Sequence, residues 1–154
     1  MDITRILTNQ CTRATLDAAS RKRALEAAAE LLAAEEPALS SRMIFDELMA
    51  RERLGSTGLG EGVAIPHCRI PCEQVHGAFL LLKQAVDYDA IDGEGVDLLF
   101  VLIVPPEENS AHLDVLAGLA GVFGDADNRK GLRSCTTDAQ LYERISGLCS
   151  SQAA

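Results

Sequence analysis

A histidine that directly follows a glycine-rich segment is the clearest sign of chemistry in this sequence. The segment Gly55 to Gly62 holds four glycines in eight positions, and Pro66 then precedes His67. Glycines let the backbone adopt positive φ and approach a ligand closely, while the proline favours an extended residue before it. Successive N–H groups in such a loop can face an anion. The pattern therefore suggests phosphoryl chemistry on the imidazole of His67.

Three other kinds of site with glycine-rich or nucleophilic motifs fail on particular residues. Gly55 and Gly60 have the glycine spacing of a nucleotide-binding P-loop, but Glu61 stands in the lysine position and would repel phosphates. The dinucleotide-binding fingerprint has a different glycine spacing. Ser56 lacks the G-x-S-x-G context of an esterase nucleophile. A flexible loop with His67 as an ordinary surface residue stays open as the alternative.

Length, charge and hydropathy restrict the class of protein. We expect one domain over residues 1–154, with a core from about 15 to 149. The formal net charge of −9 argues against nucleic acid as the main partner, because such binding relies on clustered lysine and arginine. The longest apolar run, Leu98 to Val104, is too short to cross a membrane, and residues 1–20 hold no secretory signal. We therefore expect a cytoplasmic protein without a membrane-inserted segment.

The five cysteines are odd in number, form no C-x-x-C pair, and are expected to be free thiols in or near the core. Four residues offer an alternative as zinc ligands: His67, Cys68, Cys72 and His76. Their spacing fits no standard Cys/His finger, and a strand over Val75 to Leu82 would point His76 away from the loop. A zinc-binding module stays a competing interpretation.

Two helices are expected ahead of the glycine-rich segment, and the second should carry a cation to it. The first runs from Ser20 to Glu36 before Pro37, and the second from Ser40 or Ser41 to about Arg53. The residues expected to face inward are Leu25, Ala28, Ala29 and Leu32 in the first helix, and Ile44 and Leu48 in the second. Arg51 then lies in the last turn beside the loop, although a cation there also stabilises a helix C-terminus in its own right.

Two apolar runs, Val75 to Leu82 and Val96 to Val104, have the length of central strands covered on both faces. The acidic stretch between them is expected to be a solvated connection. Together with the helices, they predict an α/β domain with a mixed central β-sheet flanked by helices on both faces.

Three helices are expected after the second strand: from Ser110 to about Phe123, from Asp127 to Arg133, and from the capping box at Thr137 onward. The inward residues expected in the first of them are Leu113, Leu116, Ala117 and Ala120. His112 then lies in its first turn, just beyond a strand end, where α/β domains tend to bind ligands. The positive end of the helix dipole favours its neutral form, which can donate one hydrogen bond. A surface histidine at a helix start is the alternative.

Four segments carry a family resemblance: Arg51-Glu52, Ser56-Thr57-Gly58-Leu59-Gly60, Val63-Ala64-Ile65-Pro66-His67 and His112-Leu113. Together they resemble the IIA domains of the bacterial phosphotransferase system, of the fructose/mannitol type, over nearly the whole chain. The stretches around Val86 and Val96 look most like the nitrogen-regulatory branch. Cys68 departs from the family, which usually has a small residue such as glycine there, and a thiol beside the histidine leaves a redox effect open.

The resemblance implies a phosphotransferase/anion-transport-protein-like fold and a role for each matching residue. His67 would accept the phosphoryl group, Arg51 would stabilise its charge, and His112 would be the auxiliary histidine. The residues implied as the phosphate-binding loop are Ser56, Thr57, Gly58, Leu59 and Gly60. The donor would be an HPr-like phosphocarrier protein, itself a phosphohistidine protein, so no nucleotide, metal or other cofactor is required.

A regulatory role follows from the charge of the phosphoryl group. Phosphorylation of His67 would add roughly one and a half to two negative charges at a docking face for which Leu59 and Ile65 are the candidate contacts. The resemblance implies targets such as potassium-transport proteins and sensor kinases, bound by the unphosphorylated protein. A sugar-specific IIA component that passes phosphate to a IIB protein, and a non-catalytic binding module, are the alternatives.

Overall fold

A computed structural model of the protein describes residues 2–107 and 111–152, and a mixed six-stranded sheet lies at its centre. The strand order is β1-β5-β6-β3-β2, and β4 pairs with β6 beyond β3. The bounds are β1 (Leu7–Leu16), β2 (Gly58–Gly60), β3 (Val63–Ala64), β4 (His67–Arg69), β5 (His76–Val86) and β6 (Val96–Val104). Strands β5 and β6 are antiparallel, while β3 and β4 both run parallel to β6.

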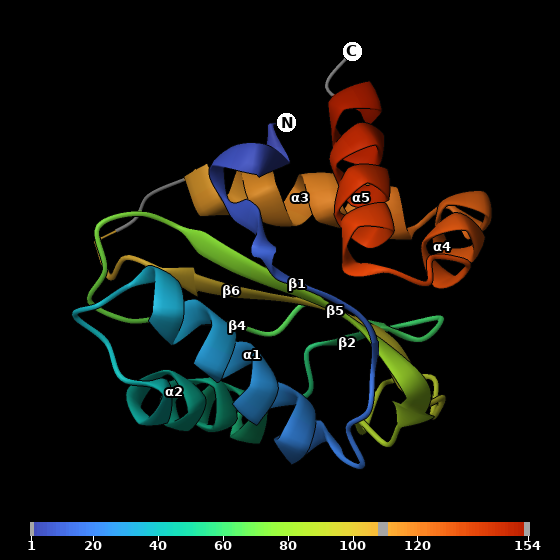
Figure 1. Ribbon diagram of the computed structural model, residues 1–154. Helices are drawn as coiled ribbons and strands as arrows, with labels where there is room; N and C mark the ends of the chain where they lie inside the picture. The colour runs from blue at the N-terminus through green and yellow to red at the C-terminus, as the bar shows by residue number, and fades with distance from the viewer. Residues whose placement is uncertain (1, 108–110, 153–154) are drawn as a thin grey trace.

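Helices cover both faces of the sheet, as predicted (Figure 1). One face carries α1 (Arg21–Glu35) and α2 (Ser41–Arg53). The other carries α3 (Ala111–Phe123), α4 (Ala126–Arg133) and α5 (Asp138–Gln152), and the short helix η1 (Ile3–Arg5) precedes β1. Within the described ranges, no helix combines the length and the apolar character that a membrane-spanning helix needs.

The two helices ahead of the glycine-rich segment confirm their predicted bounds and inward faces. The hydroxyl of Ser20 accepts the N–H of Arg23 at 3.1 Å, and that of Ser40 accepts the N–H of Met43 at 3.1 Å, so each serine caps its helix. All of the predicted inward residues are fully buried: Leu25, Ala28, Ala29, Leu32, Ile44 and Leu48.

The N-terminal strand was not predicted. The segment Leu7–Leu16 mixes apolar and polar residues without the strict alternation that marks a half-buried strand. In the structure it pairs in parallel with β5, and Leu7 and Cys11 join the core together with Ile3. The core therefore begins nearer the N-terminus than the expected boundary at about residue 15.

The inward face predicted for α3 is wrong except at Leu116, which is partly buried against the core. Leu113 is 57% exposed, and Ala117 and Ala120 are exposed as well. The residues that α3 buries fully are His112, Leu119, Val122 and Phe123. Almost every residue of α3 is apolar, so its sequence allows more than one helix face to be buried. A face without a histidine is more hydrophobic than one that contains His112, and hydrophobicity alone favours it. The predicted N-cap of α3, Ser110, lies outside the described residues.

The last two helices agree with their predictions. Helix α4 begins after Asp125, whose carboxylate accepts the N–H groups of Asp127 and Asn128. At the start of α5, the Thr137 hydroxyl accepts the N–H of Gln140 at 3.1 Å, as the capping box predicts. The Gln140 side chain reaches back to the N–H of Thr136, one residue earlier than the standard motif.

Gly77→Ala tests how tightly the central sheet is packed. A Cβ at Gly77 would lie 2.8 Å from Cε1 of Phe100, and Phe100 is fully buried against Phe79. We expect the free energy of unfolding to fall by about 1–3 kcal/mol, as overpacking does. The matched control is Gly147→Ala in α5, where nothing lies within 4 Å of the added carbon. Urea unfolding of both variants checks this, and equal stability of the two would contradict it.

Candidate functional site

One cavity brings together three residues singled out in the sequence: Arg51, His67 and His112. It has a volume of about 420 Å³ and is walled by the end of α2, by β4, by the last residue of β6 and by the start of α3. Its lining residues are Glu47, Ala50, Arg51, Leu54, His67, Cys68, Arg69, Val104 and His112. Segments more than forty residues apart in the chain therefore meet at His67.

His67 is the first residue of β4, and its ring is oriented by the backbone just before it. The N–H of Leu102 in β6 donates to the carbonyl of Pro66 at 2.9 Å, which docks the strand. The Nδ1 atom of His67 lies 2.8 Å from the carbonyl oxygen of Ile65. A carbonyl can only accept, so Nδ1 carries the proton and Nε2 keeps its lone pair. The nitrogen available to act as a nucleophile, which the sequence could not identify, is therefore Nε2.

Arg51 lies in the last turn of α2, as predicted, and its guanidinium is held near the helix end. Nη1 donates to the carbonyl of Gly55 at 2.9 Å. Gly55 adopts φ +147°, a conformation that an L-residue with a side chain rarely takes. The glycine thus lets the chain turn back so that its carbonyl faces the arginine.

Sequence reasoning missed a second guanidinium in the cavity, that of Arg69. It donates to the carbonyl of Pro106 at 3.0 Å, and its Nη2 lies 3.4 Å from Nε2 of His112. In a strand, side chains two residues apart point to the same side. Because His67 begins a strand, the side chain of Arg69 lies on the same side of that strand as His67. Recognising β4 in the sequence would have identified Arg69 as a residue of the site.

The contact with Arg69 selects one form of His112. A guanidinium has only donors, so Nε2 of His112 must accept, and the neutral ring then carries its proton on Nδ1. His112 is 8% exposed, and this Nδ1 atom is buried without a hydrogen-bond partner in the described part of the chain. A buried donor without an acceptor is costly, so the contact with Arg69 leaves Nδ1 of His112 in an unfavourable environment.

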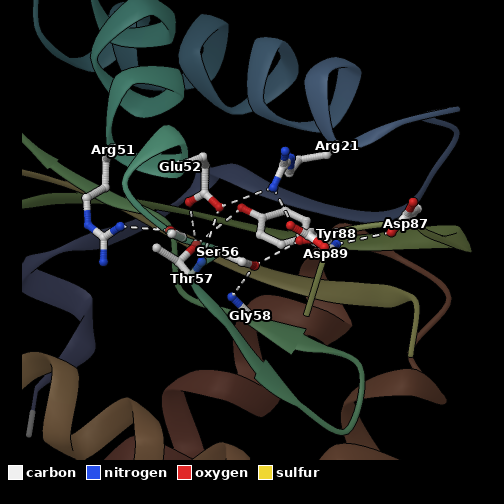
Figure 2. A network of polar contacts seen from close by, with 10 residues as sticks. Arg21, Arg51, Glu52, Ser56, Thr57, Gly58, Asp87, Tyr88 and Asp89 are labelled. Carbon is white, nitrogen blue, oxygen red and sulfur yellow. Dashed lines mark hydrogen bonds and ion pairs between the residues drawn. The ribbon is translucent and has the colours of Figure 1, made fainter. Parts of the chain in front are cut away.

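The glycine-rich segment is not the anion cradle that we expected. Its N–H groups at Thr57 and Gly58 already donate inside the protein, to Glu52 Oε1 at 3.2 Å and to Ser56 Oγ at 3.1 Å (Figure 2). From Gly58 onward the segment forms the antiparallel pair β2–β3, and the turn between them has positive φ at Gly60 and Gly62. None of the predicted loop residues, Ser56 to Gly60, lines the cavity.

One of the two predicted docking contacts is also corrected. Ile65 is 4% exposed and belongs to the core, so it cannot pack against a partner. Leu59 is 50% exposed and stays a candidate. Two further leucines are exposed at the site: Leu54, which lines the cavity and is 84% exposed, and Leu113, which follows His112 and is 57% exposed.

The zinc alternative finds no ligand set in the structure. Across residues 2–107 and 111–152, no three His, Cys, Asp or Glu side chains lie close enough to hold a metal ion. His76 instead points to Glu36, with Nε2 at 3.4 Å from the carboxylate. All five cysteines are free thiols, four of them buried, as predicted.

Comparison with known proteins shows one family. Residues 5–147 match the family described as "Phosphoenolpyruvate-dependent sugar phosphotransferase system, EIIA 2". A nitrogen regulatory protein of Pseudomonas aeruginosa is 45% identical over 141 residues, covering 91% of this chain and 92% of that protein. The 2-O-alpha-mannosyl-D-glycerate-specific EIIABC component of Escherichia coli is 33% identical over 154 residues, covering 94% of this chain and 23% of that protein.

A solved structure agrees with these matches. The crystal structure of the nitrogen regulatory protein IIA-Ntr from Neisseria meningitidis superposes with a TM-score of 0.85 at 39% identity, covering 96% of this chain and 98% of that one.

We expect the Cys68 thiol beside His67 to be unreactive. Burial raises the pKa of Cys68 to about 12, and the nearby Glu47 carboxylate adds to the effect. Cys72 is less buried, and the pKa of its thiol is raised to about 11. Since the thiolate is the reactive form, iodoacetamide at pH 8 should modify Cys68 about tenfold or more slowly than Cys72, and the rate should rise with pH.

Peptide mass spectrometry over a time course measures both rates, with urea-unfolded protein as the control in which the two thiols react alike. Native Cys68 that reacts as fast as in urea would show that it is accessible and ionised, and would reopen a redox role.

Proposed function

This chain belongs to the EIIA 2 family of the phosphoenolpyruvate-dependent sugar phosphotransferase system, and on that premise we propose that it carries a phosphoryl group on Nε2 of His67, received from an HPr-like protein. The observation that carries the proposal is the hydrogen bond of 2.8 Å between Nδ1 of His67 and the Ile65 carbonyl. It fixes the ring and leaves the lone pair of Nε2 for attack on phosphorus.

The transfer step exchanges one N–P bond for another. The Nε2 lone pair of His67 forms the new bond to phosphorus, while the bond to the donor's imidazole breaks and its electron pair returns to that ring. Phosphoryl transfer of this kind depends on positioning and on stabilisation of charge at the equatorial oxygens. The guanidinium groups of Arg51 and Arg69 supply positive charge in the cavity, which His112 also lines.

We assign the protein to the nitrogen-regulatory branch, because its relatives of 37–45% identity over nearly the full chain are nitrogen regulatory proteins. A sugar-specific role is the second candidate, because the mannosyl-glycerate component also contains a domain that is 33% identical. The site chemistry serves both roles, so only the acceptor separates them. Transfer from phosphorylated protein to a IIB protein would indicate sugar transport.

The phosphorylation test substitutes His67, Arg51 and, as a control, His76. After incubation with phosphoenolpyruvate, enzyme I and an HPr-type carrier, intact-mass spectrometry should show an acid-labile gain of one phosphoryl group. His67→Ala should abolish the gain, while Arg51→Ala should slow it by about a hundredfold, as loss of a transition-state charge does. The matched control is His76→Ala, because His76 pairs with Glu36 outside the cavity. A phosphoryl mass gain in His67→Ala would refute the proposal. So would the absence of this gain in wild type with an active donor.

Target regulation is the finer part of the proposal, and it rests on a docking surface made of Leu54, Leu59 and Leu113. The unphosphorylated protein binds a target such as a potassium-transport protein or a sensor kinase through these leucines. Phosphorylation of His67 then adds negative charge to the interface, which we expect to weaken binding about tenfold or more. Binding of purified target to unphosphorylated, phosphorylated and His67→Asp protein measures this effect.

Two substitutions locate the surface. Leu54→Arg should lose target binding, whereas Ile91→Arg, at a residue that is 90% exposed in the β5–β6 connection, should keep it. Equal binding of phosphorylated and unphosphorylated protein would contradict the switch.

A further inference from the structure

Glu52 is a buried carboxylate to which the proposed transfer step gives no role. It is the residue after Arg51 in α2, and its side chain is only 1% exposed. Both carboxylate oxygens bind one residue: Oε1 accepts the N–H of Thr57 at 3.2 Å, and Oε2 accepts the Thr57 hydroxyl at 2.6 Å (Figure 2). A buried charge is tolerated only when it is hydrogen-bonded and paired, so these bonds are part of what allows Glu52 to be there.

Arg21 and Tyr88 complete the environment of this carboxylate (Figure 2). Nη1 of Arg21 lies 3.8 Å from Oε1 of Glu52 and donates to the Tyr88 carbonyl at 3.3 Å. Its guanidinium carbon also lies 5.3 Å from the centroid of the Tyr88 ring, within cation–π range. The start of α1 and the β5–β6 connection therefore both contribute to holding the end of α2.

The hydroxyl of Tyr88 extends the chain of hydrogen bonds. Thr57 has one hydroxyl proton, and at 2.6 Å it goes to Glu52, so the contact of 3.4 Å between Thr57 Oγ1 and Tyr88 is donated by the tyrosine. Burial raises the pKa of Tyr88, and the charge of Glu52 raises it further, so the phenol keeps the proton that it donates.

The Glu52–Thr57 bonds close the four residues between them into a short loop that contains Gly55. The N–H of Gly55 donates to the backbone carbonyl of Glu52 at 3.1 Å, and its own carbonyl accepts Nη1 of Arg51 at 2.9 Å. The Ser56 hydroxyl donates to the Tyr88 carbonyl at 2.8 Å, which holds the far side of the loop. The carbonyl that orients Arg51 thus depends on contacts at both ends of the loop.

We propose that Glu52 and Thr57 are positioning residues for the guanidinium of Arg51. Neither residue lines the cavity, and they act by fixing the Gly55 carbonyl that holds Arg51 beside His67. The inference rests on the proposed function, because a misplaced guanidinium matters only if Arg51 stabilises the phosphoryl group. Small displacements of such a group are expected to slow transfer strongly.

Thr57→Val is the test variant, since it keeps the size and β-branching of the side chain and removes the hydroxyl bond to Glu52. The chain offers a matched control in Thr8→Val, because the Thr8 hydroxyl donates to Oε1 of Glu35 at 2.8 Å, outside the cavity. In phosphorylation by the HPr-type donor, we expect kcat to fall about tenfold in Thr57→Val, with KM for the donor within about twofold of wild type. Thr8→Val should match wild type in both constants.

Coupling to Arg51 separates positioning from general loss of structure. In an Arg51→Ala background, Thr57→Val should slow transfer by less than about twofold more, because the group through which it acts is gone. The proposal would be overturned if Thr57→Val slowed transfer as strongly in the Arg51→Ala background as in wild type. It would also be overturned if Thr8→Val slowed transfer as much as Thr57→Val does.

A second measurement does not depend on phosphoryl transfer. The side-chain NMR signals of Arg51 should be sharp in wild type and in Thr8→Val, and broadened in Thr57→Val, because the anchor on Gly55 is loosened. Unchanged Arg51 signals in Thr57→Val would overturn the positioning role whatever the rates are. If wild type is not phosphorylated, the proposed function fails, and the Arg51 signals still decide whether Glu52 and Thr57 position this guanidinium.

Discussion

The parallel pairing of β4 with β6 is the constraint on which the site depends. Three residues of β4 are in register with Leu102, Ile103 and Val104 at the end of the most buried strand of the sheet. This pairing places His67 next to the point where β6 ends and the chain crosses to α3. A central strand therefore sets the position of His67, and the helices on both faces supply its neighbours, Arg51 from one and His112 from the other.

Two arginines line the cavity, although the protein as a whole is negatively charged. The chain has a formal net charge of −9, so an incoming phosphoryl group meets an unfavourable overall field. Two guanidinium groups line the cavity, those of Arg51 and Arg69, and Arg51 donates to the Gly55 carbonyl. A carbonyl orients a cation without neutralising it, in contrast to the Asp97 carboxylate, which forms a salt bridge with Arg133 at 3.0 Å. The positive charge of Arg51 is therefore kept available beside His67.

Long periodic segments could be predicted from sequence, whereas short segments that depend on distant partners could not. Helices α1 and α2 carry serine caps and regular apolar spacing, and both were located to within a residue. Strands β3 and β4 have two and three residues, and only pairing with distant β6, and for β3 also with β2, makes them strands, so Arg69 was overlooked. The inward face of α3 was misassigned because a buried histidine stabilised by tertiary contacts violates the hydrophobic pattern.

The N–H groups of Thr57 and Gly58 form hydrogen bonds within the protein, and this affects how a phosphoryl carrier would release its phosphoryl group. A backbone nest that surrounds a phosphate holds it through many fixed donors, as nucleotide-binding loops do. In this protein those donors are already occupied by Glu52 and Ser56, so side chains would hold the phosphoryl group. A few side chains offer fewer donors than a backbone nest does. A site built in this way would hold the phosphoryl group less tightly than a nest does. Weaker binding would allow a carrier to transfer the group in either direction.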